Sequence, residues 1–461
     1  MRWTTLTLLA GLVGCTTPTS STETTDADEP DAGLTWSNGI STLFQENCVR
    51  CHASGQFSTY TPFQTYDQVS VKFADISSKI QFPPAWGVQM PPFPGGELAD
   101  TCEPEQAYSN DLRMSDDDIA AIRAWMLSGA PEGSGVAEPL VADSPSQLLD
   151  ATEYSFSEGY VMSIGEDDDD GHKDDYVCVI VDPGLLAPVG YLSGIQINPG
   201  VNQVFRGAVV WLDPNRDSRA YVEAGSTRAH GENWYDCDEG FGFEGQILAG
   251  FLPKGEPIAT PPGAAIEIDA NALIVYKIHY HAHYDHVNPD DTDKLPPLLE
   301  WADDTSLSLR WEKPGEVARV ATALTFGNYD ESAVDGTGTL TAPFLIPPGA
   351  AMHVESMVRR VPGDPDDGFA VWAVLPEMKD AGRTVAVSVT RQDSSRECLA
   401  ANPRWEASWQ LPLTYDTTIG APMVYGGDQL RIDCTYLNPT GLDLTLAEES
   451  CRAMIGLVPV D

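Results

Sequence analysis

The pattern of hydrophobic and polar positions changes twice along the chain. A predominantly apolar run at residues 6–13 comes first, and segments with apolar residues three or four positions apart follow as far as residue 130. Beyond residue 150 the apolar residues form short runs rich in Val, Ile, Thr and aromatic residues. Three- and four-residue spacing is typical of helices, and short β-branched runs are typical of strands. The pattern predicts a short leading segment, a small helical part and a longer β part.

Two helices are predicted before residue 130. The first covers residues 36–47. The second starts at Ser115, which is followed by three aspartates and then by apolar residues spaced mostly three or four apart between positions 119 and 126. Serine before acidic residues is a helix start signal, and Gly129 with Pro131 is a stop signal.

The β part is predicted from seven segments separated by turn signals such as the Pro-Pro-Gly sequences at 261–263 and 347–349. These segments are residues 176–181, 207–212, 273–281, 339–344, 370–375, 384–390 and 429–436. A spacer rich in Gly, Ser, Glu and Pro, residues 131–147, separates them from the helical part. Two successive sandwiches or jelly rolls fit the length of this region.

The charge balance restricts the class of partner. The 461 residues include 69 Asp or Glu and 26 Lys or Arg, so the formal net charge is −43. Such a chain cannot neutralise the phosphates that dominate nucleic-acid affinity, and an anionic lipid surface would repel it. We therefore expect no nucleic-acid partner. The acidic run at residues 166–170 is interpreted as a solvated turn rather than a cation site.

The first residues are typical of an export signal. Met1-Arg2 supplies positive charge, and the apolar run after it is too short to span a bilayer. The sequence Leu12-Val13-Gly14-Cys15 resembles a bacterial lipobox, which would place a lipid on Cys15; a plain secretory signal is the alternative. Residues 16–33 are expected to form a flexible tether. The interpretation predicts an exported protein, lipid-anchored to the cell envelope in the periplasm or at the cell surface.

The most specific motif is Cys48-Val49-Arg50-Cys51-His52, a C-x-x-C-H sequence. This spacing is typical of covalent c-type haem attachment, in which two thiols bind one porphyrin and the adjacent imidazole binds the iron. A redox or zinc C-x-x-C is the alternative, although the chain has no second C-x-x-C. The sequence predicts haem c, attached through Cys48 and Cys51 with His52 as an axial ligand.

The second axial ligand is predicted to be Met90. It begins the sequence Met90-Pro91-Pro92-Phe93, which would present a thioether on a rigid loop. The alternative is that Met90 is a core methionine, and Met114 is the competing ligand. A haem with such ligands would exchange electrons with a redox partner protein or with a small-molecule donor or acceptor.

The remaining cysteines are expected to form disulfides, because the compartment is oxidising. Cys15, Cys48 and Cys51 account for three of nine, and the other six allow three bridges in 15 connectivities. Cys434 and Cys451 are the candidate pair.

Half of the eight histidines lie within residues 279–286. On a strand, His279, His281 and His283 would point to one face, where three imidazoles could bind copper or zinc. The alternative is a strand that ends in a polar loop with one structural histidine.

Two family resemblances follow from the order of these segments. Residues 34–133 resemble the class I cytochrome c domains. Residues 150–461 resemble the copper type II, ascorbate-dependent monooxygenases, which include the peptidylglycine α-hydroxylating and dopamine β-monooxygenases. The short sequence segments that carry this second resemblance are residues 198–200, 211–214, 234–237, 274–280, 375–382, 427–434 and 448–451. The second resemblance implies two linked jelly rolls that each supply one copper, one accepting electrons and one activating O₂.

The copper ligands that this resemblance implies are mostly absent. The family's paired histidine ligands of the first copper site align with Arg206-Gly207 of this chain. The family's His-x-His ligands of the second site align with residues 377–379 (Glu-Met-Lys), and its methionine ligand aligns with Ser450. Only His279 matches. Arginine and lysine offer no lone pair at neutral pH, glycine has no side chain, and a hydroxyl binds Cu(I) poorly. Arg206 and Lys379 are expected to pair with carboxylates instead.

The expected fold class is a multidomain chain, with a small all-α cytochrome c domain followed by two all-β jelly-roll or sandwich subdomains. The expected parts are a signal peptide (1–14), a tether (15–33), a haem domain (34–133), a linker (134–149) and two sandwiches (150–315 and 316–461).

Three hypotheses about function follow. The first is a haem c electron-transfer lipoprotein whose β part has lost the copper sites. The second is an active copper-dependent monooxygenase that uses the histidine cluster, with electrons supplied by the haem. The third is a structural envelope protein.

Overall fold

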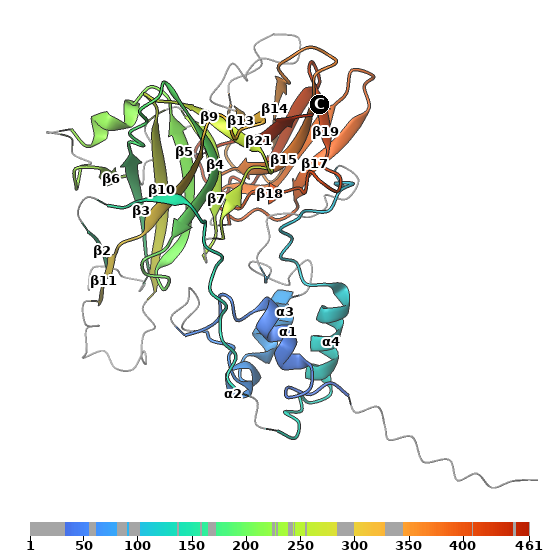
Figure 1. Ribbon diagram of the computed structural model, residues 1–461. Helices are drawn as coiled ribbons and strands as arrows, with labels where there is room; N and C mark the ends of the chain where they lie inside the picture. The colour runs from blue at the N-terminus through green and yellow to red at the C-terminus, as the bar shows by residue number, and fades with distance from the viewer. Residues whose placement is uncertain are drawn as a thin grey trace, which may run out of the picture.

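The computed structural model describes most of the chain after residue 32. The described residues are 33–54, 61–80, 90–91, 102–135, 138–156, 159–164, 172–223, 226, 229–237, 243, 245–253, 256–283, 299–327, 344–407, 409–445 and 449–460. Cys15, the acidic run at 166–170 and nearly all of the predicted strand at 339–344 lie outside them. In Figure 1 the helices form a lower body and the strands form a larger upper body.

Four α-helices lie in the lower body, which we call the helical region. They are α1 (Ile40–Asn47), α2 (Tyr66–Ser70), α3 (Phe73–Ile80) and α4 (Asp116–Leu127). Their shared core includes Trp36, Phe44, Ile76, Ile122 and Trp125. Both predicted helices are present, but the first starts at Ile40, because Gly39 before it has a positive φ of 101°. At α4 the Ser115 hydroxyl accepts a hydrogen bond from the Asp118 amide at 3.1 Å, as the start signal predicts.

The strands form four sheets, which together we call the β-module (described residues 151–460). The ten-stranded sheet follows the order β1 (Ala151–Tyr154), β12 (Ser306–Glu312), β4 (Val189–Asn198), β9 (Ala264–Asp269), β13 (Arg319–Gly327), β21 (Arg452–Pro459), β15 (Gly368–Glu377) and β18 (Leu413–Thr414), with β8 (Ile258–Ala259) on β4 and β19 (Met423–Tyr425) on β15. The five-stranded sheet is β6 (Trp234–Asp236), β3 (His172–Val181), β10 (Leu273–His283), β5 (Phe205–Asp213) and β7 (Gln246–Phe251). The four-stranded sheet is β14 (His353–Arg360), β20 (Gln429–Tyr436), β16 (Gly382–Thr390) and β17 (Arg396–Asn402), and β11 (Leu299–Asp303) pairs with β2 (Tyr160–Ile164). A 3₁₀ turn, Asp217–Tyr221, follows β5.

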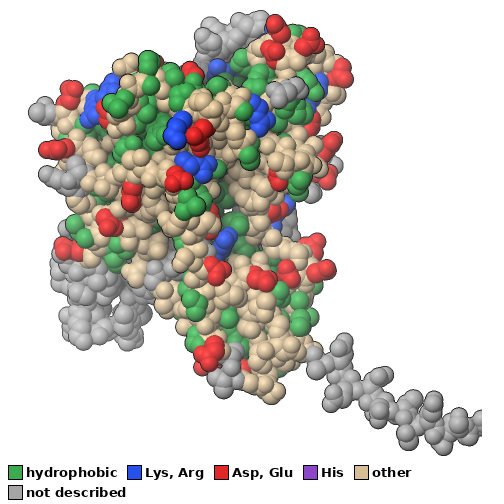
Figure 2. Space-filling view, in the orientation of Figure 1, with side chains coloured by type: hydrophobic (Ala, Val, Ile, Leu, Met, Phe, Trp, Pro, Cys, Tyr) green, Lys and Arg blue, Asp and Glu red, His purple; other side chains and the backbone are tan. Residues whose placement is uncertain are grey.

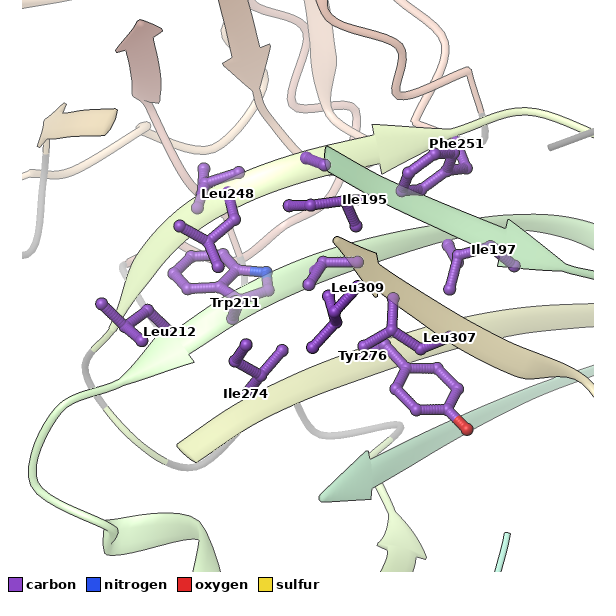
Figure 3. Close-up of a cluster of buried hydrophobic side chains, with 14 of the residues drawn as sticks. Ile195, Ile197, Trp211, Leu212, Leu248, Phe251, Ile274, Tyr276, Leu307 and Leu309 are labelled. Atoms are coloured by element: carbon purple, nitrogen blue, oxygen red, sulfur yellow. The ribbon is translucent and has the colours of Figure 1, made fainter. Parts of the chain in front are cut away.

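Two large apolar cores hold the sheets together. The first lies between the five-stranded sheet and one half of the ten-stranded sheet, and Figure 3 shows Trp211, Ile274 and Leu309 meeting there. Along β10, Ile274 and Tyr276 enter this core, whereas Leu273 and Val275 enter a smaller cluster on the other face. That alternation is the two-residue period of a strand. The second large core lies beneath the four-stranded sheet.

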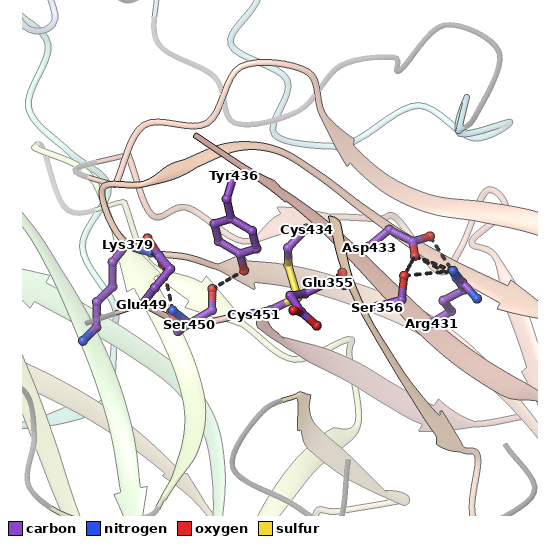
Figure 4. The surroundings of a disulfide bond; sticks show 10 residues. All are labelled: Glu355, Ser356, Lys379, Arg431, Asp433, Cys434, Tyr436, Glu449, Ser450 and Cys451. Atoms are coloured by element: carbon purple, nitrogen blue, oxygen red, sulfur yellow. Dashed lines mark hydrogen bonds and ion pairs between the residues drawn. A yellow bond between two sulfur atoms is a disulfide. The ribbon is translucent and has the colours of Figure 1, made fainter. Parts of the chain in front are cut away.

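Six cysteines form three disulfides, Cys102–Cys398, Cys178–Cys237 and Cys434–Cys451. The last is the pair suggested by the sequence, and Figure 4 shows it between β20 and the start of β21. The disulfide Cys102–Cys398 joins two residues that are 296 positions apart. It connects the segment before α4 to β17 of the β-module.

The fold class expected from the sequence is wrong. The described chain is mainly β-structure in several sheets, and no separate small all-α domain of the cytochrome c kind is present in it. Between α3 and α4, the chain from Cys102 onward crosses to the β-module. It is joined to the β-module by the Cys102–Cys398 disulfide and by a hydrogen bond between Ser109 and Thr414. Nor do the strands divide into two sandwiches, because strands from both sides of residue 315 share one ten-stranded sheet. Local patterns predicted the elements but carried no information about these long-range pairings.

The strand predictions agree with the structure wherever it can be compared. Residues 176–181, 207–212 and 273–281 lie within β3, β5 and β10, and residues 370–375, 384–390 and 429–436 lie within β15, β16 and β20. Among the described helices, none has the length and apolar character needed to cross a bilayer.

Candidate functional site

The C-x-x-C-H motif forms a turn at the end of α1. The amides of Cys51 and His52 donate to the carbonyl of Cys48 at 3.2 and 2.9 Å. Both cysteines are half-buried and lie outside the three disulfides. Burial raises the pKa of the Cys48 thiol to about 12, and the neighbouring Cys51 acts in the same direction. The turn therefore presents two thiols, of which Cys48 is held protonated, next to one imidazole.

The imidazole of His52 is fixed by two contacts. Its Nδ1 lies 2.8 Å from the carbonyl oxygen of Thr61, and its ring stacks on Phe63 with centroids 4.4 Å apart. Because a carbonyl only accepts, Nδ1 carries the hydrogen, and Nε2 keeps its lone pair. Burial lowers the pKa of His52, so the ring is neutral near pH 7. A neutral, oriented imidazole is the form that binds a metal.

Met90 and Met114, the two candidate thioether ligands, occupy different environments. The Met90 amide donates to the carbonyl of Lys79 at 3.0 Å, and its half-buried side chain lines the same cavity as Cys48, Cys51 and His52. Met114 is 7% exposed and belongs to the core of the helical region. The structure thus groups Met90, and not Met114, with the motif.

The cavity has a volume of about 570 Å³ and lies between the helical region and the β-module. One side is formed by the motif, Phe63, Ile76 and Ile80, and the other by β-module residues that include Phe251 and Trp372. Figure 2 shows the surface narrowing where the two bodies meet, with acidic side chains spread over both. The volume lies within the range of small-molecule and cofactor sites.

The donor set of this cavity fits a covalently attached haem. Two thiols, an imidazole with an available Nε2 and a thioether face one largely apolar space. Lys72 and Lys79 line it, together with Asp75, Glu256 and Asp416. Burial, followed by the positive charge of Arg404, lowers the pKa of Lys79. Cationic side chains at an apolar cofactor site suit a cofactor that carries carboxylates. Cys48 and Cys51 would hold the ring, and His52 and Met90 would hold the iron.

Two of the three histidines in the predicted cluster, His279 and His281, have described side chains. His279 and His281 point to the same face of β10, and both contact one carboxylate oxygen of Asp174, His279 through Nε2 at 2.7 Å and His281 through Nδ1 at 2.9 Å. These hydrogen bonds hold the pKa of Asp174 well below its usual range. His279 also stacks on Tyr176. The side chain of His283 lies outside the described residues.

The part of this cluster that the structure describes does not complete a metal site. Among the described residues, no group of three or more His, Cys, Asp or Glu side chains could hold a metal ion. Asp174 contacts one nitrogen of each ring, Nε2 of His279 and Nδ1 of His281. Arg206, where the monooxygenase resemblance places a ligand, is mostly buried; burial lowers its pKa to about 10, and Asp174 opposes that shift.

The positions expected for the second copper hold a buried ion pair and a core methionine. Glu377 of β15 is bonded to Arg452 of β21, with Arg452 Nη2 donating to Glu377 Oε1 at 2.7 Å. The Arg452 guanidinium also lies 4.2 Å from the ring centre of Trp211. Met378 is fully buried in the second large core. The Glu377–Arg452 pair joins two neighbouring strands of one sheet, and these side chains present no open ligand set.

Ser450 and Lys379 occupy the rest of that site (Figure 4). The Ser450 carbonyl accepts from the Tyr436 hydroxyl at 2.7 Å, and the Lys379 amide donates to Glu449. Burial raises the pKa of Glu449 to about 6. In the described residues the buried Ser450 hydroxyl oxygen has no hydrogen-bond partner.

Sequence reasoning missed the β-module side of the cavity and the partner of the histidines. No local pattern marks Trp372 or Phe251 as neighbours of the C-x-x-C-H motif. Asp174 had a weak sequence signal, because the polar residues Lys173-Asp174-Asp175 come just before the apolar run of β3. They pair with residues 280–282 of β10.

Comparison with known proteins does not assign a family. No protein-family model matches the chain, and no curated protein matches it. Among solved structures, the VP2 subviral particle of infectious bursal disease virus matches at 9% identity over 69% of this chain and 75% of that one, with a TM-score of 0.19. A peptide-N(4)-(N-acetyl-β-D-glucosaminyl) asparagine amidase matches at 10% identity over 67% and 96%, with a TM-score of 0.24. PNGF-II matches at 7% identity over 67% and 65%, with a TM-score of 0.25. Similarity this low carries no functional argument.

Proposed function

We propose that the chain is an exported c-type haem protein that transfers electrons. The observation that carries this proposal is the convergence of Cys48, Cys51, His52 and Met90 on one cavity. The sequence separates Met90 from the motif by about forty residues, and the cavity brings the four side chains to a common space. Three disulfides elsewhere in the chain support an oxidising, exported location.

Each residue of the cavity has a defined role in this proposal. Cys48 and Cys51 would hold the ring through thioethers, and the hydrogen bond from His52 Nδ1 to Thr61 leaves Nε2 available as an iron ligand. Met90 would hold the iron as well, and a thioether ligand raises the reduction potential relative to a second histidine. Phe63, Ile76 and Ile80 exclude water. Haem iron held in this way supplies one-electron chemistry.

The charge and the amino-terminal segment define the setting of this activity. Lipid on Cys15 would anchor the chain to the cell envelope, with residues 16–33 as a tether. The formal net charge of −43 favours encounter with a basic or neutral redox partner, because opposite charges attract.

The alternative is a copper-dependent monooxygenase that hydroxylates a C–H bond with O₂. One observation favours it: His279 and His281 lie on one face of β10. Copper titration of the purified chain tests the alternative, with His281→Ala as the variant. Stoichiometric copper that is lost in His281→Ala would favour the monooxygenase; the proposed function predicts no stoichiometric copper in either protein.

The experiment for the proposed function is a reduced-minus-oxidised visible spectrum. The full chain is produced with haem-maturation machinery, and the double variant Cys48→Ser/Cys51→Ser is produced in parallel. We expect a c-type spectrum from the wild type only. Because Cys178→Ser/Cys237→Ser removes two cysteines far from the motif, it serves as the matched control and should retain the spectrum. A wild-type chain without a Soret band would overturn the proposal.

A further inference from the structure

The cavity is formed by two bodies that are far apart in the sequence. Its helical side carries all four proposed haem-binding residues, whereas its other side consists of β-module residues that no motif predicts. Phe251 and Trp372 on that side are 1% and 3% exposed, so they are fixed core residues rather than mobile surface groups. Ile258 and Leu411 are half-buried and also line the cavity.

A short segment fastens this second wall to the helical region. We call residues 102–114 the strap. At its start, Cys102 forms the disulfide with Cys398 of β17, and at its end, Met114 lies in the helical core. The strap therefore connects the two bodies that form the cavity.

The middle of the strap forms hydrogen bonds with β18 and the residue before it, at the edge of the cavity. The Ser109 amide donates to the Thr414 carbonyl at 2.7 Å, and the two hydroxyls of these residues lie 2.8 Å apart. The Asn110 side chain donates to the Pro412 carbonyl at 2.7 Å and accepts from the Thr414 amide at 3.0 Å. Ser109, Asn110 and Thr414 all line the cavity. These bonds fix the distance between its two walls.

We propose that the β-module is the second wall of the haem pocket, held in place by the strap, and that this wall sets the reduction potential of the haem. The inference rests on the proposed function and adds a role for the β-module. Ferric haem carries one more positive charge than ferrous haem. The wall is largely apolar, with Glu256 and Asp416 as the carboxylates in its lining. Its apolar part excludes water, which disfavours the more highly charged state and so raises the potential.

The first test places a charge on the β-module wall. Ile258→Glu adds a further carboxylate to the cavity lining, beside Glu256 and Asp416. Leu186→Glu adds the same charge at a β-module residue that is fully exposed and does not line the cavity. Redox titration of the full-length holoprotein measures the ratio of ferrous to ferric haem. At the wild-type midpoint we expect Ile258→Glu to lower this ratio about tenfold, which corresponds to about 59 mV for one electron. Leu186→Glu should leave it within about twofold of the wild type, because solvent screens an exposed charge.

The second test releases the strap. Cys102→Ser/Cys398→Ser removes the disulfide that fastens it, and Cys178→Ser/Cys237→Ser removes a disulfide whose residues do not line the cavity. We expect a lower potential and faster binding of added imidazole in the first variant alone. This readout remains informative if Ile258→Glu fails to fold.

The outcomes separate the two proposals. A wild-type chain without haem overturns the proposed function and this inference together. A haem protein whose potential is the same in the wild type, in Ile258→Glu and in the Cys102/Cys398 double variant overturns this inference and leaves the proposed function standing.

Discussion

The Nδ1 of His52 lies 2.8 Å from the carbonyl oxygen of Thr61, nine residues further along the chain. This contact determines which nitrogen of the ring is available. A backbone carbonyl can accept but not donate, so the hydrogen is on Nδ1, and Nε2 is left for a metal. The same arrangement, an oriented imidazole beside two thiols outside disulfides, is what a covalent haem requires.

Replacement of Met90 by histidine should lower the reduction potential and keep the haem. A second imidazole stabilises ferric iron more than a thioether does. Met114→Leu is the matched control, because Met114 lies in the helical core and Leu has a similar volume. Redox titration and the ferric spectrum measure the effect. Equal effects of the two substitutions would contradict the assignment of Met90 as the ligand.

Asp174→Asn should destabilise the fold at neutral pH by about 1 kcal/mol, a value below the usual range for charged hydrogen bonds because Asp174 is half-exposed. His279 and His281 lower the pKa of Asp174 in the folded chain. The stabilisation that Asp174 provides is therefore complete at pH values above 3.8, its ordinary pKa. It decreases as the pH falls below that value. Urea unfolding at several pH values should show the wild-type and variant curves converging below pH 3.8. A difference that stays constant down to pH 2 would argue against this explanation.

Single substitutions in the Glu377–Arg452 pair should be costly, and the double substitution much less so. Glu377 and Arg452 are 8% and 6% exposed, so Arg452→Met leaves a buried carboxylate without its partner. We expect a loss of about 3 kcal/mol for Arg452→Met or Glu377→Leu alone. The double variant should recover most of that loss, as measured by a double-mutant cycle in denaturant. Additive losses would show that the two side chains act independently.

The sequence predicted local structure well wherever one segment determined it. The Ser115 cap and the bounds of β20 followed from residue types and spacing, and the two-residue period of β10 placed His279 and His281 on one face. The C-x-x-C-H motif likewise located the proposed attachment site.

The features that the sequence did not predict are long-range. The disulfide Cys102–Cys398 belongs to one of the 15 connectivities that six cysteines allow, and nothing local favours it. The wall formed by Phe251 and Trp372 depends on how the β-module meets the helical region. For the same reason, the shared ten-stranded sheet replaced the expected pair of sandwiches.

The most direct test of the account is the intact mass and iron content of the purified full-length chain under denaturing conditions. Denaturation removes any haem that is bound only by contacts, so the added mass reports bonds to Cys48 and Cys51. The account predicts the mass of one haem and one iron per chain, both lost in Cys48→Ser/Cys51→Ser. A wild-type chain with the bare polypeptide mass and no iron, after expression with haem-maturation machinery, would contradict it.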